Sequence, residues 1–207
     1  MKTVNSKTLH KATNKDGTRT FLALHELTVE QAGKQRPYYM VTRGEIIVPH
    51  DTKRPDAVII VGIRYTPAGP QLVVTSEYRI PIGTREISFP AGLIDPADYE
   101  GTTSVQQAAV KAAEREFLEE TGLLLTEAEV SAQNLYASAG MTNESSIIVI
   151  GKATGEPTTE NAEETEDIQV MLLSQDDIGR LLSCRDMAFS KVVWPFLWAF
   201  NKFGLKV

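Results

Sequence analysis

Three glutamates fall within little more than one turn of a predicted helix near the middle of the chain. The segment Arg115–Leu123 reads REFLEETGL, and helical periodicity places Glu116, Glu119 and Glu120 on one side of the helix axis. Carboxylates this close repel one another, and a bound divalent cation relieves the repulsion. Hard oxygen ligands suit Mg²⁺ or Mn²⁺ rather than zinc. The segment therefore predicts a metal-binding helix, and a metal ion held in this way would bind phosphate.

The segment resembles the second half of the Nudix hydrolase signature, G-x5-E-x7-R-E-U-x-E-E-x-G-U, where U is a bulky aliphatic residue. Arg115 begins the match, and Phe117 takes an aliphatic position. The signature places Arg fourteen positions after Gly, whereas Gly92 precedes Arg115 by 23 positions (115 − 92), so nine residues are inserted. We assign Gly92 because Phe89–Asp95, FPAGLID, resembles the ADP-ribose pyrophosphatase branch. We interpret Gly101, at the nominal spacing, as a turn in the insertion.

The signature also has a glutamate eight positions before the arginine, where this chain has Gln107. A neutral amide cannot replace an anionic ligand. Ser104 and Gln107 instead match a reciprocal capping box, which predicts that the helix begins here and that Gln107 is structural. The REFLEE carboxylates are the core metal ligands in the branch that this chain resembles. The resemblance therefore implies that the missing carboxylate affects an extra metal site more than activity, and Asp98 or Glu100 in the insertion are candidates to compensate.

The resemblance implies a metal site with two or three Mg²⁺ or Mn²⁺ ions. Its ligands would be the carboxylates of Glu116 and Glu120 and the carbonyl of Ala91. Glu119 would be either a further ligand or a partner of Arg115. We interpret Arg115 as a residue that orients the ligands, because pairing with a neighbouring glutamate fixes ligand rotamers.

A second match gives a candidate substrate contact. The segment Leu72–Gly83 resembles the family pattern V-x-x-x-E-Q-Y/F-R-x-P-x-G, and Arg79 occupies its arginine position. A guanidinium matches pairs of phosphate oxygens with its forked donors, so Arg79 is a candidate for binding a substrate phosphate or ribose. The alternative is a surface ion pair with Glu77 or Glu86.

Further candidates lie earlier in the chain. Arg43 resembles the arginine that follows the aromatic-led first strand of the family. Tyr38 or Tyr39 is a candidate for stacking on the base of a substrate, although a core or hairpin position explains either tyrosine equally well.

Two acidic segments supply candidates for the catalytic base. Ala137–Glu144, ASAGMTNE, resembles the family loop S-P-G-x-x-D/N-E. A carboxylate on a glycine-hinged loop could position or deprotonate water, so Glu144 is the first candidate, with a solvated loop tip as the alternative. Glu163–Val170, EETEDIQV, is similar to E-x-E-D-I-E/R-V, which makes Glu166 a candidate auxiliary ligand or base. Without that match, such a charge run indicates a solvated loop.

Composition narrows the class of protein. The chain has 207 residues, 42% of them hydrophobic, and a formal net charge of −6. This size fits one domain with a sizeable core, and the acidic charge argues against a nucleic-acid-binding surface. The single Cys184 excludes an internal disulfide and fits a reducing compartment. No apolar signal segment is visible near the N-terminus, and Ser190–Leu205 is too short and too charged to span a bilayer. We therefore expect a cytoplasmic protein with no membrane partner.

The alternation of apolar runs and turn signals predicts an α/β or α+β domain. The Nudix resemblance implies the α+β form, an α/β/α sandwich with a mixed central sheet. We expect a small N-terminal β accessory region, residues 1–50, followed by a Nudix domain, residues 51–207, and a homodimer. The predicted segments are strands at Phe21–Val29, Tyr38–Val48, Ala57–Ile63, Gln71–Tyr78, Glu86–Phe89, Gln133–Ser138, Ser146–Ile150 and Ile168–Leu173, and helices from Ser104 to Thr121 and from Ser174 onward.

The leading hypothesis is metal-dependent hydrolysis of the pyrophosphate bond of a nucleoside diphosphate sugar, with ADP-ribose giving AMP and ribose 5-phosphate. One alternative is another nucleotide sugar or a dinucleotide as substrate. Another is a non-catalytic Nudix module for ligand binding or sensing, which the insertion and Gln107 would suit. The intact acidic cluster disfavours this second alternative.

Overall fold

The computed structural model describes residues 2–17, 20–43, 54–160 and 167–204. They form two compact units. The first unit contains Met1–Asp56 and Gln133–Ser146, and the second contains Ala57–Ala132 and Ile147–Val207. The division of the chain into functional domains at residue 50 stays a prediction.

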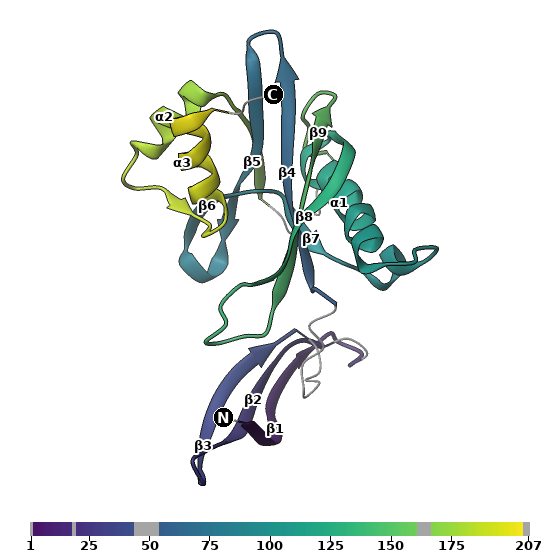
Figure 1. Cartoon of the computed structure of the whole chain (residues 1–207), viewed down its shortest axis with the longest axis vertical. Coiled ribbons are helices and arrows are strands. Elements are labelled where there is room, and N and C mark those ends of the chain that lie inside the picture. Colours follow the sequence, from purple (N-terminus) through teal and green to yellow (C-terminus); the bar gives the residue numbers. More distant parts are fainter. Residues whose placement is uncertain (1, 18–19, 44–53, 161–166, 205–207) are drawn as a thin grey trace. The chain divides into compact units, whose positions relative to one another are not determined.

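The first unit contains an antiparallel sheet of three strands, β1 (Lys2–Thr13), β2 (Thr20–Gln31) and β3 (Lys34–Thr42), in the order β1-β2-β3 (Figure 1). A two-residue turn joins β2 to β3, and both of its residues, Ala32 and Gly33, have positive φ angles of 51° and 74°. This geometry matches the right-handed twist of the flanking strands. The N-terminal sheet is thus confirmed.

Strand β1 was not predicted, because it carries no alternation of apolar and polar residues. All twelve of its residues are exposed, and the register with β2 shifts at three points. Strand β3 begins earlier than the predicted strand Tyr38–Val48, and residues 44–53 lie outside the described part of the chain. Backbone pairing with β2, rather than a hydrophobic pattern, defines both strands.

The second unit is built on an eight-stranded mixed sheet with the path β11-β6-β5-β4-β9-β8, in which β10 also pairs with β5 and β7 with β4. Its strands are β4 (Ala57–Thr66), β5 (Gly69–Arg79), β6 (Thr84–Ser88), β7 (Ala91–Leu93), β8 (Leu124–Tyr136), β9 (Ser145–Thr154), β10 (Ile168–Leu173) and β11 (Ala188–Phe189). The last four residues of β8 and the first two of β9 are assigned to the first unit.

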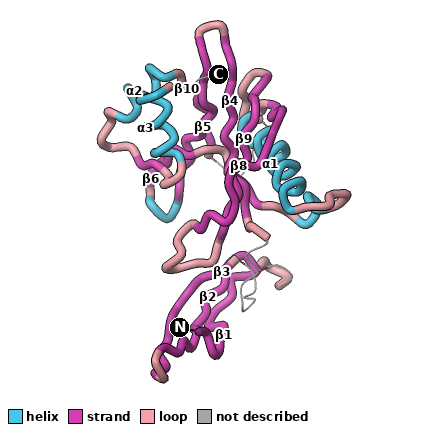
Figure 2. Tube along the Cα trace, viewed as in Figure 1, coloured by secondary structure: helices cyan, strands magenta, loops and turns pink. Residues whose placement is uncertain are grey.

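Helices lie on both faces of this sheet (Figures 1 and 2). Helix α1 (Val105–Thr121) covers one face, and α2 (Gln175–Leu182) and α3 (Val193–Phe203) cover the other. Two short 3₁₀ turns, η1 (Ile80–Ile82) and η2 (Pro96–Tyr99), complete the elements. The predicted α/β/α sandwich is confirmed, and no helix among the described residues is long and apolar enough to cross a membrane.

The main core lies between α1 and the sheet. Four fully buried alanines of α1 let the helix approach the strands closely, and Phe117 fills the space beside them. The phenyl ring lies so close to Gly62 of β4 that a Cβ atom there would clash with it. The alanines are Ala108, Ala109, Ala112 and Ala113.

Most strand predictions for this unit are confirmed, including the β4–β5 hairpin and β10. The prediction for Gln133–Ser138 was wrong at its start, because β8 begins at Leu124, directly after α1. Positive φ angles at Glu127 and Asn134 mark irregularities in β8, which interrupt the period-two pattern by which a strand is recognised.

Candidate active site

Helix α1 begins and ends where its local sequence predicts. Ser104 is the N-cap, and its Oγ accepts a hydrogen bond of 3.2 Å from the Gln107 backbone N–H. Gly122 ends the helix with a φ of 69°, a left-handed conformation that glycine adopts without strain. The reciprocal half of the predicted capping box was wrong: the Gln107 side chain accepts from the backbone N–H and hydroxyl of Thr103, at 2.8 and 2.9 Å.

The short strand β7 holds the backbone opposite the acidic face of α1. It pairs antiparallel with β4, which aligns Ile59 with Ala91 and Val58 with Gly92. The Ala91 backbone N–H donates a hydrogen bond of 3.3 Å to Oε2 of Glu120. Glu120 is only 6% exposed, so a backbone donor rather than solvent faces one of its carboxylate oxygens.

Gly92 lies against the carboxylate of Glu116. A Cβ atom built on Gly92 would overlap that carboxylate, so no other residue fits here unless Glu116 moves. Gly101 contrasts with it, because its φ is +72° and a Cβ atom there would meet nothing within 4 Å. These environments fit the assignment of Gly92 as the signature glycine and of Gly101 as a turn in the insertion.

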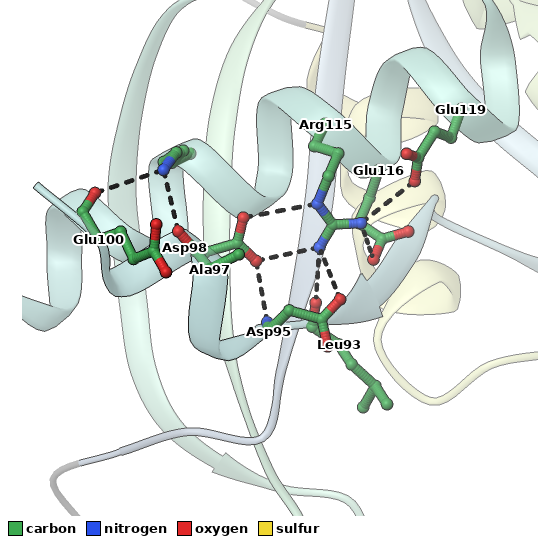
Figure 3. Close-up of polar contacts among 9 residues, drawn as sticks. Leu93, Asp95, Ala97, Asp98, Glu100, Arg115, Glu116 and Glu119 are labelled. Atoms are coloured by element: carbon green, nitrogen blue, oxygen red, sulfur yellow. Dashed lines mark hydrogen bonds and ion pairs between the residues drawn. The ribbon is translucent and has the colours of Figure 1, made fainter. Parts of the chain in front are cut away.

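Arg115 lies at the centre of a network of carboxylates (Figure 3). Its Nη1 donates to Glu116 at 2.8 Å and to Glu119 at 3.1 Å, and its Nη2 donates to the carbonyl oxygen of Leu93 at 3.1 Å and to Asp98 at 3.0 Å. Burial lowers the pKa of Arg115, but hydrogen bonds and charges from Asp98 and Glu116 outweigh burial and raise the pKa overall. The guanidinium is therefore charged and fixed in place.

Asp98 and Glu100, the two candidates to compensate for Gln107, lie in different environments. The side chain of Asp98 is 4% exposed and faces Arg115. Glu100 is exposed, and its backbone carbonyl accepts a hydrogen bond of 3.4 Å from Lys111. The contact between Asp98 and Arg115 was not anticipated, because the sequence gives no signal of where an insertion folds back.

The donor set suits a hard divalent cation. Glu116 and Glu120 come from successive turns of α1, and both approach the backbone at Ala91–Gly92. Carboxylate and carbonyl oxygens are ordinary Mg²⁺ ligands, and Mg²⁺ usually completes its shell with water and substrate phosphates. Within the described ranges, no three histidine, cysteine, aspartate or glutamate side chains are already arranged as a metal cage. The positive observation is the donor set itself: the carboxylates of Glu116 and Glu120 lie beside the Ala91–Gly92 backbone, and oxygen donors of this kind suit Mg²⁺.

Arg79, the candidate phosphate contact, forms the predicted alternative contacts in this structure. Its Nη1 lies 2.8 Å from a Glu77 oxygen, and its Nε lies 3.6 Å from a Glu86 oxygen. Its side chain is 42% exposed, so the guanidinium remains accessible from solvent.

Arg43 and Glu144 lie in the first unit and form an ion pair, with Arg43 Nε 2.8 Å from Glu144 Oε1. Tyr39 is 54% exposed, and its hydroxyl donates to Glu26 at 2.9 Å. The hydrogen bond from Tyr39 to Glu26 and the negative charge of Glu26 raise the pKa of Tyr39. Glu166 lies outside the described residues.

The loop that carries Glu144 is tied to β3. Tyr38 Oη donates to the Gly140 carbonyl at 2.7 Å, and the Val41 backbone N–H donates to the Met141 carbonyl at 2.8 Å. A cavity of about 340 Å³ opens between them, and most of its lining is apolar. The sequence had indicated Tyr38 and the loop Ala137–Glu144, which supplies Ala139, Met141, Thr142 and Asn143 to the lining. The other two lining residues, Met40 and Tyr136, were not candidates.

The chain is similar to known proteins in sequence and in fold. A Caenorhabditis elegans protein named "Putative nudix hydrolase 2" is 32% identical over 109 residues, which cover 50% of this chain and 45% of that protein. The chain thus matches less than half the length of this relative. A solved structure titled "Crystal structure of ADP compounds hydrolase" superimposes with a TM-score of 0.64 at 18% identity, covering 98% of this chain and 96% of the other, which shows a shared fold.

The model of the NUDIX domain family matches residues 53–186, well over half of the chain. This range contains α1 with its acidic face, β7, and the whole insertion between them. The chain is therefore a member of the Nudix family.

Proposed function

We propose that this chain is a divalent-metal-dependent hydrolase that cleaves the pyrophosphate bond of a nucleoside diphosphate sugar, with ADP-ribose giving AMP and ribose 5-phosphate. The observation that carries this proposal is the placement of the Glu116 and Glu120 carboxylates against the Ala91–Gly92 backbone. Membership of the Nudix family supports nucleotide pyrophosphate chemistry. The resemblance of Phe89–Asp95 to the ADP-ribose pyrophosphatase branch supports the choice of substrate.

The ligands proposed for Mg²⁺ or Mn²⁺ are Glu116, Glu120 and the Ala91 carbonyl, with two or three ions per site. Bound metal would neutralise the non-bridging oxygens of the pyrophosphate and lower the pKa of a water molecule. The protein's own part is to hold the ligand oxygens in place, since phosphoryl transfer depends mainly on positioning and charge stabilisation. The backbone N–H of Ala91 holds one carboxylate oxygen of Glu120 in this way.

Arg115 is proposed as the residue that orients the ligands. One guanidinium nitrogen contacts Glu116 and Glu119 together, so it offsets part of their mutual repulsion and restricts their rotamers. Glu119 is 47% exposed at its side chain and paired with Arg115. This environment favours the role of Glu119 as a partner of Arg115. For Glu119 to act as a further metal ligand, its side chain would have to rotate away from Arg115.

Glu144 is proposed as the general base, with Glu166 as the alternative on sequence grounds alone. The Glu144 side chain is 27% exposed and accepts from Arg43, which holds the carboxylate at a defined position on its loop. A base must lie within hydrogen-bond reach of its water in the substrate complex. Release of Glu144 from Arg43 would allow the loop to bring the carboxylate within reach of that water.

For the substrate, Arg79 and Arg43 are proposed to bind phosphate or ribose, and Tyr39 is proposed to stack on the base. The guanidinium of Arg79 is already paired with two acids, so a substrate anion would have to compete with them. The Tyr39 ring is exposed while its hydroxyl is anchored on Glu26, which fixes the ring edge and leaves a face for a planar ligand. We also propose a homodimer, which size-exclusion chromatography with light scattering would test.

The test is product release from a panel of ADP-ribose, other nucleoside diphosphate sugars, dinucleotides and nucleoside triphosphates. Each compound is assayed with Mg²⁺, with Mn²⁺ and with EDTA, and a Glu120→Gln variant serves as the matched inactive control. We expect EDTA-sensitive cleavage of ADP-ribose to AMP and ribose 5-phosphate. Preference for another compound would change the substrate and retain the chemistry, whereas no cleavage despite metal binding would indicate a binding module.

A further inference from the structure

Two side chains on one face of α1 hold the insertion along the helix. Gln107 and Lys111 lie four positions apart, so they project from the same face. The Gln107 amide oxygen accepts from Thr103, and Lys111 Nζ donates to the carbonyl oxygens of Ala97 and Glu100, at 3.0 and 3.4 Å. Successive turns of the helix thus form hydrogen bonds to different parts of the insertion.

The third contact on this face is of a different kind, because it joins two charges. Arg115 lies four positions beyond Lys111, and its Nη2 and Nε approach the Asp98 carboxylate at 3.0 and 3.4 Å. Oδ2 of Asp98 also accepts from the Asp95 backbone N–H at 2.9 Å. A carboxylate with 4% of its side chain exposed requires such compensation, since burying an unpaired charge is strongly unfavourable.

Arg115 therefore connects the insertion to the acidic face of α1 (Figure 3). Its Nη2 contacts Asp98, while its Nη1 contacts Glu116. A guanidinium is planar, with its five N–H groups in a rigid fork, so fixing one nitrogen fixes the direction of the others. If Arg115 turned away from Glu116, its contact with the buried Asp98 would also be lost.

We propose that Asp98 is a positioning residue for the metal-binding carboxylates, acting through Arg115. This inference rests on the function proposed above. The insertion would then supply a carboxylate, that of Asp98, which supports the metal site indirectly. Position 107 itself carries an amide. Asp98 does not itself become a ligand, because its two oxygens are directed at Arg115 and the Asp95 backbone.

The test is the affinity for Mn²⁺ alone, measured without substrate by electron paramagnetic resonance or calorimetry. Asp98→Asn keeps the shape of the side chain and removes its charge, and we expect the dissociation constant for Mn²⁺ to rise about 10- to 100-fold. Glu100→Gln is the matched control: it removes an exposed acid from the same insertion, and its affinity should stay within about twofold of the parent value. An Asp98→Asn variant that binds Mn²⁺ as tightly as the parent would overturn the inference.

A double-mutant cycle separates positioning from a general loss of structure. If Asp98 acts through Arg115, the combined variant Asp98→Asn/Arg115→Gln should bind Mn²⁺ no more weakly than Arg115→Gln alone. Independent effects that multiply would contradict the inference. Melting curves in EDTA establish that each variant is folded. If Asp98→Asn does not fold, Asp98→Ser, which keeps a hydrogen-bond acceptor, takes its place in the same cycle.

Failure of this inference is distinguishable from failure of the proposed function. The parent protein reports on the function, and the ratio of parent to variant Mn²⁺ affinity reports on Asp98. A parent that binds Mn²⁺ but cleaves no pyrophosphate would refute the hydrolase, while a weakened Asp98→Asn variant would still support the role of Asp98. A parent that binds no Mn²⁺ would overturn both.

Discussion

The carboxylate of Glu116 packs directly against Gly92 and occupies the space that a Cβ atom at position 92 would need. The contact joins β7 to the acidic face of α1. It gives a physical reason for glycine at this position, since any Cβ atom would displace a proposed metal ligand.

We predict that Gly92→Ala weakens Mn²⁺ affinity by at least about tenfold, because the new methyl group must push the Glu116 carboxylate aside. The displaced atoms are the end of a flexible side chain, so the free energy of unfolding should change by less than about 1 kcal/mol. Calorimetric metal titration and thermal melts measure the two effects.

Gly101→Ala is the matched control for this substitution. Its left-handed φ of +72° should cost stability, about 1 kcal/mol, but open space around it leaves the metal site untouched. Equal Mn²⁺ affinities for Gly92→Ala and the parent protein would refute the proposed position of Glu116.

Glu120→Gln should abolish metal-dependent turnover, with a loss greater than about 100-fold. The amide is nearly isosteric, so a variant with the parent's melting temperature in EDTA would show that the loss is chemical. Glu119→Gln, at a half-exposed position paired with Arg115, should have a smaller effect. An active Glu120→Gln enzyme would overturn its assignment as a ligand.

Glu144→Gln tests the general base. We expect turnover to fall by about 10²- to 10⁴-fold, with Mn²⁺ affinity close to the parent value, because Glu144 is proposed to act on water rather than to hold metal. Glu127→Gln, which removes an exposed partner of Lys152, is the control and should retain activity. Full activity of Glu144→Gln would move the role to Glu166.

His25 predicts a pH dependence of stability in the first unit. It is fully buried in β2, its Nδ1 lies 3.1 Å from the Thr8 hydroxyl and its Nε2 lies 2.9 Å from the Thr42 hydroxyl. Burial, with a smaller contribution from Lys11, lowers the pKa of His25 below its ordinary value of 6.5. Below pH 6.5 the unfolded chain therefore binds a proton more readily than the folded chain does, and protonation favours unfolding.

The stability that neutral His25 contributes should be present in full above pH 6.5 and should decrease as pH falls from there through the folded-state pKa. Thermal melts between pH 7.5 and 5 measure this. His25→Gln should be less stable at pH 7.5 but should lose less on acidification, and His10→Gln, on an exposed strand, should follow the parent protein. Parallel pH profiles for the parent and His25→Gln would contradict the prediction.

Local sequence determined much of this structure. The cap at Ser104, the left-handed Gly122 and the helical spacing of the glutamates predicted the bounds and the acidic face of α1, because caps and periodicity act within a few residues. The turn between β4 and β5 and the capping box at Ser174 were predicted for the same reason, and both are confirmed. The Nudix resemblance was likewise contained in contiguous segments.

Tertiary structure alone decided which distant groups meet. The sequence identified Gly92 and Glu116 but not their contact, and it placed Asp98 in an insertion without a partner. Strand β1 has no hydrophobic pattern, so only its pairing with β2 defines it. These features depend on where the backbone returns after many residues. That path is set by packing and by the need to compensate buried charge, and neither is encoded in a short stretch of sequence.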